Sequence, residues 1–363
     1  MPSATAFAFE PSAAPVPAEE RARRLDSPRF GRVFTDHMAL VRYTDAAGWH
    51  DARITARAPV QMDTSSAVLH YAQEIFEGLK AYRRPHGGAA LFRPEANARR
   101  FQASARRMAM PELPEALFLE SIRALVRSEK AWIPDGPDGA LYLRPFMFAS
   151  ESFLGVRPAG EYLYAVIAAS VGPYFKAGAP AVSLWVTRDY SRAAPGGTGA
   201  AKCGGNYAAS LVAQAEAIRE GCDQVVFLDA IERRWVEELG GMNIFFAFAD
   251  GSLATPPLTG TILPGITRDS ILRLARDLGI AAREEPYAIE QWRADAASGR
   301  LTEAFACGTA AVVTAIGTVR SADGGFTIGD GGPGPITRRI RAALVAIQRG
   351  EAADPYGWIE EVC

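Results

Sequence analysis

Cysteine is scarce in this chain: the 363 residues include four, at Cys203, Cys222, Cys307 and Cys363. No two of them form a C-x-x-C pair, and the four histidines do not join them in a metal-binding spacing. This scarcity argues against a disulfide-stapled secreted fold and favours a reducing, cytoplasmic compartment. We expect no metal site.

Long apolar runs and a strong net charge are also lacking. No apolar stretch approaches the ~20 residues that span a membrane, and the net charge of −2 argues against a nucleic-acid coat protein. The Ala- and Pro-rich start lacks the basic and apolar regions of a signal peptide. A basic cluster falls within a helical pattern, which indicates a solvated helix face; its members are Arg99, Arg100, Arg106 and Arg107. We expect a cytoplasmic protein that binds neither membrane nor nucleic acid.

The length suggests two domains, and a hydrophobic content of 48% is enough for an ordinary core. Helical and strand-like patterns come in blocks, and hairpin signals such as Asp250-Gly251 dominate. This favours an α+β fold with mainly antiparallel sheets over a doubly wound parallel sheet. The expected parts are a loosely ordered arm (1–30), a small α/β domain (31–171), an interdomain loop (172–181) and a large domain (182–363).

The segment GGTGAAKCGGNYAAS, residues 196–210, places one lysine among glycines and small side chains. A lysine acts as a nucleophile when burial or a neighbouring cation lowers the pKa of its amine. Small neighbours would leave room for a carbonyl compound to reach Lys202. A surface lysine in a flexible loop is equally compatible with this stretch alone, and Tyr207 is equally compatible with a core aromatic.

Two further stretches could bind charged groups. In LPGITRDSIL a turn at Pro264-Gly265 precedes a helix for which Thr267 is the expected N-cap, and free amides at a helix start bind phosphate, although most capped helices bind nothing. In WVEELGGMN the adjacent Glu237 and Glu238 point to opposite faces of a strand, so one can face inward. A buried carboxylate would suit a protonated pyridine nitrogen; a solvent-facing acid on an edge strand is the alternative.

The run ALYLRP places Tyr142 and Arg144 on one strand face, where they could bind a carboxylate or form a structural pair. In CGTAA, Gly308 allows close backbone approach and Thr309 offers a hydroxyl and an amide. An amine for a Schiff base, an acid for a ring nitrogen, a phosphate cradle and a carboxylate receiver together describe a pyridoxal phosphate enzyme acting on amino acids.

The runs FTDHM, FEGLKAYR, YLRPF, AKCGGNYAASL, LPGITRDSIL and CGTAA resemble the branched-chain amino acid aminotransferases, of the fold-type IV pyridoxal phosphate class. The resemblance extends from about Phe34 to Thr318. It implies the two-domain architecture of D-amino acid aminotransferase-like proteins and a homodimer whose pocket the partner's small domain completes. It also implies reversible ping-pong amino transfer between Leu, Ile or Val and 2-oxoglutarate, through a Schiff base of pyridoxal 5'-phosphate with Lys202.

The same resemblance implies roles for individual residues. Tyr207 would bond the phenolic oxygen of the cofactor, and Glu238 would face its pyridine nitrogen. The phosphate would be held by Arg93, Ile266, Thr267 and Thr309. Tyr142 and Arg144 would receive the side-chain carboxylate of glutamate. The α-carboxylate would meet the turn of Gly308, Ala310 and Ala311, and the aliphatic pocket would be lined by Phe34, Tyr71 and Tyr174.

Two departures from the family pattern matter. Leu239 follows Glu238 where relatives often have a small residue, so the choice of Glu238 over Glu237 rests on its distance from the N-x-F run. Ala311 and Thr314 stand where mammalian relatives carry a C-x-x-C pair, so we expect no thiol switch, and we expect Cys203 to be a packing residue.

Three other readings share parts of this pattern. They are a same-fold lyase acting on an aminated chorismate, a D-amino acid aminotransferase, and a metabolite-binding protein with a degenerate site. None of the catalytic groups is missing, which disfavours the last. The sequence does not rank leucine, isoleucine and valine, because one methylene in an apolar pocket is worth only ~1–3 kcal/mol.

Overall fold

The computed structural model describes residues 6–173 and 181–363, which form two compact units. The first unit takes in the described residues up to 173 together with Ala201–Gly204 and Ile347–Cys363, and the second takes in the rest. The sequence alone places both of these added segments in the C-terminal domain. Of the expected interdomain loop, 172–181, residues 174–180 lie outside the described residues.

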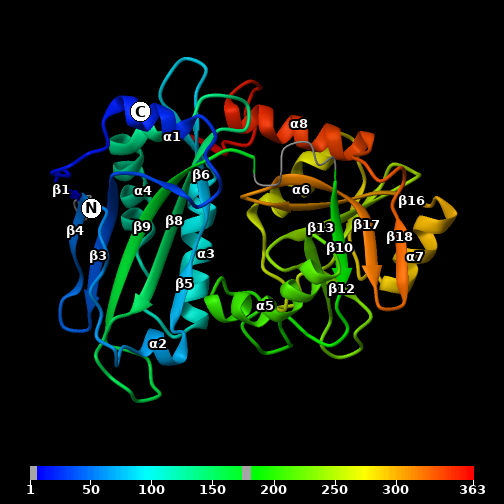
Figure 1. Cartoon of the computed structure of the whole chain (residues 1–363), viewed down its shortest axis with the longest axis horizontal. Helices are drawn as coiled ribbons and strands as arrows, with labels where there is room; N and C mark the ends of the chain where they lie inside the picture. The colour runs from blue at the N-terminus through cyan, green and yellow to red at the C-terminus, as the bar shows by residue number, and fades with distance from the viewer. Residues whose placement is uncertain (1–5, 174–180) are drawn as a thin grey trace. The chain divides into compact units, whose positions relative to one another are not determined.

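One mainly antiparallel sheet forms the first unit (Figure 1). Its strands run in the order β1 (Ala8–Phe9), β4 (Gly48–Ala56), β3 (His37–Thr44), β9 (Glu161–Val171), β8 (Ala140–Ala149), β6 (Leu79–Arg83), β7 (Ala89–Phe92) and β19 (Ile359–Glu361). Two short strands pair outside this path: β2 (Val33–Phe34) with β9, and β5 (Glu74–Phe76) with β8. Among these described pairings, β1 with β4 alone is parallel.

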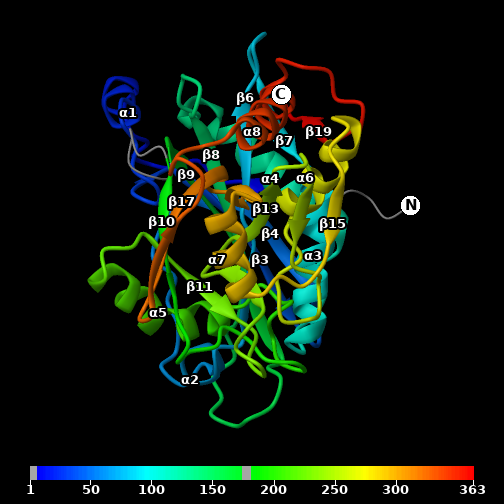
Figure 2. The same cartoon turned by 90° about the vertical axis from the view of Figure 1, so that its right-hand side faces the viewer.

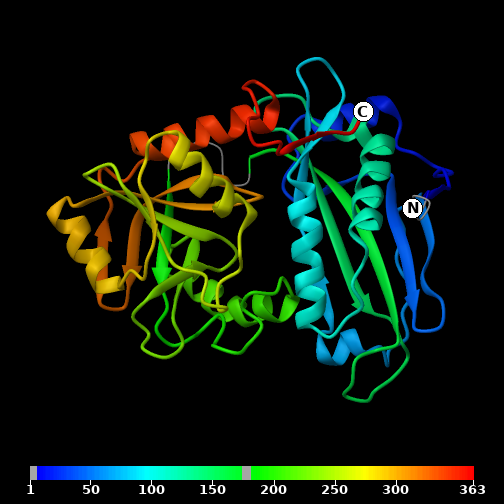
Figure 3. The same ribbon diagram turned by 180° about the vertical axis from the view of Figure 1, so that it is seen from behind.

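Helices cover one face of this sheet. The amphipathic helices α3 (Pro94–Arg107) and α4 (Glu115–Glu129) pack there, in front of the strands in Figure 3. The side chains of Leu141, Leu143 and Met147 alternate along β8 into this core, because successive residues of a strand point to opposite faces. The intervening residues, Tyr142 and Arg144 among them, lie on the face opposite these helices.

The remaining helices of the first unit are short: α1 (Ala18–Leu25), α2 (Ala67–Tyr71) and the 3-10 turn Lys130–Trp132. The prediction of a loosely ordered arm is wrong for its described part. The Ser12 amide donates to His37 Nε2 at 2.9 Å, and the Val16 amide donates to Asp36 Oδ1 at 2.9 Å. Backbone amides of the arm thus bind side chains beside β3, a pairing that a Pro-rich sequence does not reveal.

The second unit contains a mixed sheet. Its strands run in the order β12 (Val236–Leu239), β11 (Gln224–Leu228), β10 (Val182–Val186), β17 (Val312–Ser321), β16 (Leu301–Gly308), β13 (Asn243–Phe248), β14 (Leu253–Thr255) and β15 (Ala282–Glu284), and β18 (Gly324–Thr327) pairs with β17. The parallel pairs are β10 with β11, β10 with β17, and β14 with β15. Across both units the antiparallel pairs prevail, so the predicted α+β class is confirmed.

The helices of this part of the chain are α5 (Gly204–Arg219), α6 (Ile266–Asp277), α7 (Ile289–Ser298) and α8 (Pro335–Arg349). Figure 2 turns the second unit toward the viewer and shows α7 crossing in front of its strands. The strand predicted at WVEELGGMN ends within that run, because β12 stops at Leu239 and β13 begins at Asn243. The break falls at Gly240 and Gly241, after which β13 pairs with β14 and β16.

Candidate active site

Lys202 lies in a segment that hydrogen bonds hold on both sides within the first unit. The Lys202 carbonyl accepts the amide of Phe76 on β5 at 2.9 Å, and the Lys202 amide donates to Ser104 Oγ on α3 at 3.0 Å. The Gly204 amide donates to the Glu74 carboxylate, and a Cβ at Gly204 would overlap that carboxylate. Cys203 is 1% exposed in the core, as expected of a packing residue.

The Lys202 amine is perturbed by its surroundings. Its Nζ lies 4.7 Å from the centroid of the Phe76 ring. Burial and the Arg100 cation lower the pKa of Lys202 to about 8, with a further contribution from Arg144, although the Glu77 carboxylate and Tyr142 act in the opposite direction. About a tenth of the side chain would therefore be neutral at pH 7, which gives a usable nucleophile.

Glu77 forms a buried ion pair beside this amine. Its Oε1 lies 2.7 Å from Arg100 Nε, while Oε2 accepts from Arg100 Nη2 at 2.8 Å and from Asn97 Nδ2 at 2.7 Å. The Arg100 side chain is 10% exposed, so the prediction that it belongs to a solvated basic face is wrong. Arg99 and Arg106, at 61% and 57%, do face solvent. Arg100 differs because its helix position turns it toward Glu77.

We expect Glu77→Gln to destabilise the protein by about 3 kcal/mol, because it leaves Arg100 without its carboxylate partner. Although burial alone would raise the pKa of Glu77, Arg100 holds it below its usual range. The contribution of the pair is therefore complete above the ordinary carboxyl pKa and is lost as the pH falls through the lowered one. Urea unfolding at pH 7 and at lower pH measures both effects.

Glu115→Gln is the matched control, because Glu115 faces the exposed Arg99 at 3.9 Å and should contribute little. Equal unfolding midpoints for wild type and Glu77→Gln would contradict the expectation.

Strand register brings three predicted substrate residues to one face of the first sheet. Phe34 on β2 and Tyr142 on β8 both pair with Ala169 on β9, from opposite sides. Arg144 Nη2 donates to the Tyr142 hydroxyl at 3.1 Å, and its Cζ lies 4.8 Å from the centroid of the Phe76 ring. The predicted sharing of one face by Tyr142 and Arg144 is confirmed. The sequence does not predict a role for Phe76, although Phe76 begins the run FEGLKAYR.

Glycine is required beside the Tyr142 hydroxyl. A Cβ at residue 78 would lie 2.1 Å from that oxygen, so the hydroxyl of Tyr142 fits only because residue 78 is glycine. The Phe30 ring packs edge-on against Tyr142, with centroids 4.9 Å apart. Arg144 Nε is buried and makes no hydrogen bond within the described chain. The guanidinium therefore retains a donor that a ligand could use.

The other predicted residues of the first unit are Tyr71, Arg93 and Tyr174. The Tyr71 side chain is 43% exposed, and its hydroxyl donates to the Leu154 carbonyl at 2.6 Å. Arg93 precedes α3 in a left-handed conformation, with φ 52°, and its guanidinium lies 5.2 Å from the ring of Trp358. Trp358 was missed, since it is distant in the sequence. Tyr174 lies outside the described residues.

In the second unit, both glutamates of β12 are buried. Glu238 is 2% exposed; its Oε1 accepts the Leu263 amide at 2.9 Å and lies 2.7 Å from Arg192 Nη1. Glu237 accepts the Thr261 hydroxyl, and burial raises its pKa despite that bond. An inward glutamate was expected, and the structure buries both, since both faces of β12 are covered; neither is the solvent-facing acid of the alternative. Arg192 was missed, and no local pattern in the sequence signals its pairing with Glu238.

The start of α6 differs from the predicted cap. Gly265 is the N-cap residue and Thr267 is the second residue of the helix, so the N-cap prediction for Thr267 is wrong. Asn243 explains the glycine, because a Cβ at Gly265 would lie 1.9 Å from Asn243 Oδ1, while Asn243 Nδ2 donates to the Leu263 carbonyl at 3.1 Å. The amides of Ile266 and Thr267 still lie in the first turn, where helices commonly bind anions.

The turn between β16 and β17 contains the remaining predicted residues. Gly308 pairs with Val312, and the turn leaves Thr309 and Ala310 half-buried and Ala311 9% exposed. Tyr207 lies on α5, half-buried, and its ring is 3.6 Å from the position of a Cβ at Gly241. These residues, Glu238 and the start of α6 all belong to the second unit, whereas Lys202, Tyr142 and Arg144 belong to the first.

Comparisons with known proteins identify the family. Residues 74–319 match the family described as amino-transferase class IV. The chain is 56% identical, over 97% of both sequences, to a probable branched-chain-amino-acid aminotransferase of Streptomyces coelicolor, and 55% identical, over 97% of both, to the branched-chain-amino-acid aminotransferase of Mycolicibacterium smegmatis.

Solved structures agree with these sequence relatives. The Escherichia coli branched-chain amino acid aminotransferase superposes with a TM-score of 0.75 at 32% identity, covering 90% of this chain and 99% of that one. A second branched-chain amino acid aminotransferase, solved with pyridoxamine 5'-phosphate, gives 0.73 at 29% identity, with coverage of 90% and 99%. Within the described residues, no helix has the length and apolar character needed to cross a membrane. The chain belongs to the branched-chain-amino-acid aminotransferases of the class IV aminotransferase family.

Proposed function

We propose that this chain transfers amino groups reversibly between leucine, isoleucine or valine and 2-oxoglutarate, with pyridoxal phosphate held covalently by Lys202. The observation that carries the proposal is the Lys202 amine, whose pKa is lowered to about 8, on the Phe76 ring that also contacts Arg144. One ring thus adjoins both a potential nucleophile and a carboxylate receiver. The resemblance of the surrounding motifs supports the same conclusion.

The residues present fit the cofactor. When bound, pyridoxal phosphate supplies an aldehyde carbon that accepts the amino group and a ring that withdraws electrons from the substrate α-carbon. Arg93 and the first-turn amides of α6, at Ile266 and Thr267, would bind its phosphate, with Thr309 as a further donor. Tyr207 would donate to the phenolic oxygen.

Two residues would handle protons. Lys202 Nζ, as a neutral amine, would take the proton from the substrate α-carbon and return it in the reverse direction. Glu238 would accept a hydrogen bond from the ring nitrogen through its carboxylate. Arg192 and the Leu263 amide compensate the charge of that carboxylate, which allows it to stay buried without a proton.

Substrate recognition would divide between two kinds of group. Arg144 and Tyr142 would bind the side-chain carboxylate of glutamate or 2-oxoglutarate, and the amides of the turn Gly308, Ala310 and Ala311 would bind the α-carboxylate. The aliphatic side chains would pack against Phe34 and Tyr71.

The proposal includes a homodimer whose partner completes the pocket. Its support is an exposed apolar patch on the first unit, made of Leu69, Tyr71, Leu154 and Val156, which are 56%, 43%, 59% and 87% exposed. The Tyr71–Leu154 hydrogen bond joins the two segments, and such patches mark association surfaces. Sedimentation velocity would show the mass of two chains. A cytoplasmic location also belongs to the proposal, and the four unpaired cysteines support it.

A panel of amino donors tests the function. The loaded protein should form glutamate from 2-oxoglutarate with leucine, isoleucine and valine, and much more slowly with aspartate or D-leucine. We expect Arg144→Leu to raise the KM for 2-oxoglutarate about 30-fold or more and to change the KM for leucine only a few-fold, because a charge-assisted bond is lost for one substrate alone.

Arg283→Leu is the matched control. Arg283 also contacts an aromatic ring, with its Cζ 5.8 Å from the centroid of Phe248, but its side chain is 46% exposed and lies 3.3 Å from Glu285. Both KM values should stay at wild-type levels. Equal rises of both KM values in Arg144→Leu would exclude a specific carboxylate contact, and a panel without glutamate from any branched-chain donor would reject the function.

A further inference from the structure

The Phe76 ring lies against two cations. Arg144 Cζ is 4.8 Å from its centroid, and Lys202 Nζ is 4.7 Å. Each cation is attracted to the ring, but the two positive charges repel each other, and nearby carboxylates reduce that repulsion. Glu77, the next residue, is already engaged, since both its oxygens bind Arg100 and Asn97. Glu77 is thus paired with Arg100 and not with Arg144.

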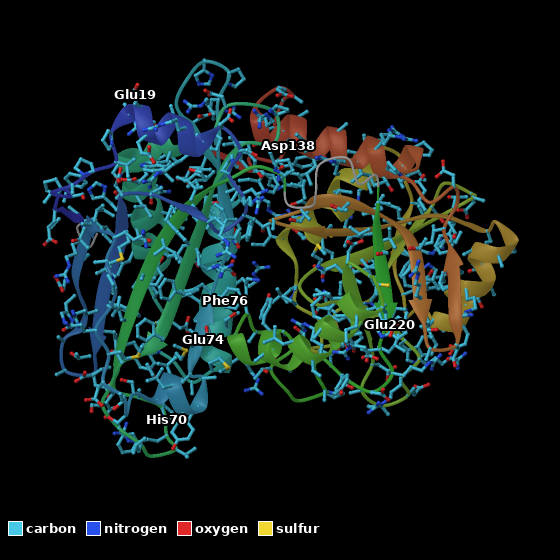
Figure 4. All side chains as sticks on the ribbon, in the orientation of Figure 1. Glu19, His70, Glu74, Phe76, Asp138 and Glu220 are labelled. Carbon is cyan, nitrogen blue, oxygen red and sulfur yellow. The ribbon has the colours of Figure 1, made fainter. Side chains whose placement is uncertain are left out.

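Glu74 is placed to supply it. Glu74 and Phe76 occupy alternate positions of β5, and their register partners on β8 are Phe148 and Phe146. Cross-strand partners share a face, so Glu74, Phe76 and Arg144 all belong to the face opposite α3 and α4. Figure 4 shows Glu74 and Phe76 projecting close together from β5.

The Glu74 carboxylate has two interactions of different kinds. It accepts the Gly204 amide, two residues after Lys202, and so helps to hold the lysine segment. The Arg144 charge also affects its pKa. Burial raises the pKa of Glu74, while the Gly204 amide and the Arg144 charge act against that rise. Arg144 thus stabilises a carboxylate on its own sheet face.

The two kinds of substrate side chain require opposite electrostatic surroundings at Arg144. A carboxylate side chain gains from an uncompensated guanidinium, whereas an aliphatic side chain would leave that guanidinium half-buried without an anion. We propose that Glu74 compensates Arg144 when an aliphatic side chain occupies the pocket, and thereby sets the balance between aliphatic and dicarboxylate substrates. This inference rests on the proposed function.

The consequence for each substrate has a definite sign. With leucine, Glu74 serves as the anion of Arg144. With 2-oxoglutarate, the substrate carboxylate binds the guanidinium, whose Nε is available, and Glu74 competes with it for that positive charge. Glu74 therefore favours the aliphatic side chain and weakens the binding of the dicarboxylate.

Calorimetric titration of the cofactor-loaded protein with two unreactive acids tests this. Glutarate represents the dicarboxylate, and 4-methylpentanoate represents the aliphatic substrate. Glu74→Gln keeps an oxygen for the Gly204 amide but loses the charge. We expect it to bind glutarate about tenfold more tightly and 4-methylpentanoate several-fold more weakly. Glu74→Asp, which keeps the charge, should stay near the wild-type ratio.

Two controls separate this role from simple support of the fold. Glu161→Gln, at an exposed position of β9, should leave both affinities unchanged. In an Arg144→Leu background, adding Glu74→Gln should no longer alter glutarate binding, because its effect acts through the guanidinium. Thermal unfolding verifies that each variant is folded. If Glu74→Gln does not fold, Glu74→Ala is used in its place.

The outcomes distinguish the role of Glu74 from the proposed function. An unchanged ratio of affinities in Glu74→Gln, or equal weakening of both acids, overturns the role of Glu74 while the function stands. If the wild type neither binds glutarate nor forms glutamate from 2-oxoglutarate, the proposed function is rejected and the inference with it.

Discussion

Replacing Lys202 with alanine is expected to lower kcat for amino transfer from leucine by at least about 10³-fold. The variant loses both the amine that would hold the cofactor and the base that would move the α-proton, and residues acting in one step are not replaced by their neighbours. Glutamate formation measures the rate. Borohydride reduction of the loaded wild type, followed by peptide mass analysis, should place the phosphopyridoxyl group on the peptide that contains Lys202.

The chain offers a clean comparison because it has only four lysines, at positions 80, 130, 176 and 202. Lys130 is exposed, so Lys130→Ala should leave both the rate and the label unchanged. Since the pKa of Lys202 is about 8, uptake of the cofactor by the free protein should become faster as the pH rises from 7 to 9. A label on another lysine would reject the assignment.

The second large effect concerns Glu238. We expect Glu238→Ala to lower kcat by about 10²- to 10³-fold, since it removes the acceptor proposed for the ring nitrogen. It also leaves Arg192, whose side chain is 2% exposed, buried without its carboxylate, so a lower thermal unfolding temperature should accompany the loss. Glu238→Gln keeps the shape of the side chain and separates these two effects.

Glu237 provides the matched control for the assignment. It is the preceding residue of the same strand and is also buried, but it bonds Thr261 and lies on the other face of β12. Glu237→Gln should keep kcat within a few-fold of wild type. If Glu237→Gln lost more activity than Glu238→Gln, Glu237 and not Glu238 would be the acid that faces the ring nitrogen.

Elements with a strong local period were predictable from the sequence. The helical pattern that contains Arg99 and Arg107 appears as α3, at Pro94–Arg107, and the strand that places Tyr142 and Arg144 on one face appears as β8, at Ala140–Ala149. The shared face of Tyr142 and Arg144 follows from the same period of two. These features depend on neighbouring residues alone, which is why a single sequence reveals them.

Pairings between distant residues could not be predicted. Arg192 meets Glu238 46 residues later, and Arg100 meets Glu77 from a different element, so neither leaves a periodic signal. The prediction that Arg100 faces solvent is wrong because helical spacing tells which residues share a face but not what that face contacts. The N-cap prediction for α6 is wrong for a related reason, since Asn243, which lies on the distant strand β13, occupies the space beside Gly265.

The pairing of β19 with β7 affects the order in which the chain can fold during synthesis. The first unit needs residues from the beginning of the chain, from Ala201–Gly204 and from Ile347–Cys363. Until the ribosome has made Ile359–Glu361, β7 keeps one edge without its partner strand. An open edge is a site for unwanted pairing between chains. The nascent first unit is therefore incomplete until Ile359–Glu361 has been made, although most of its sheet is made early.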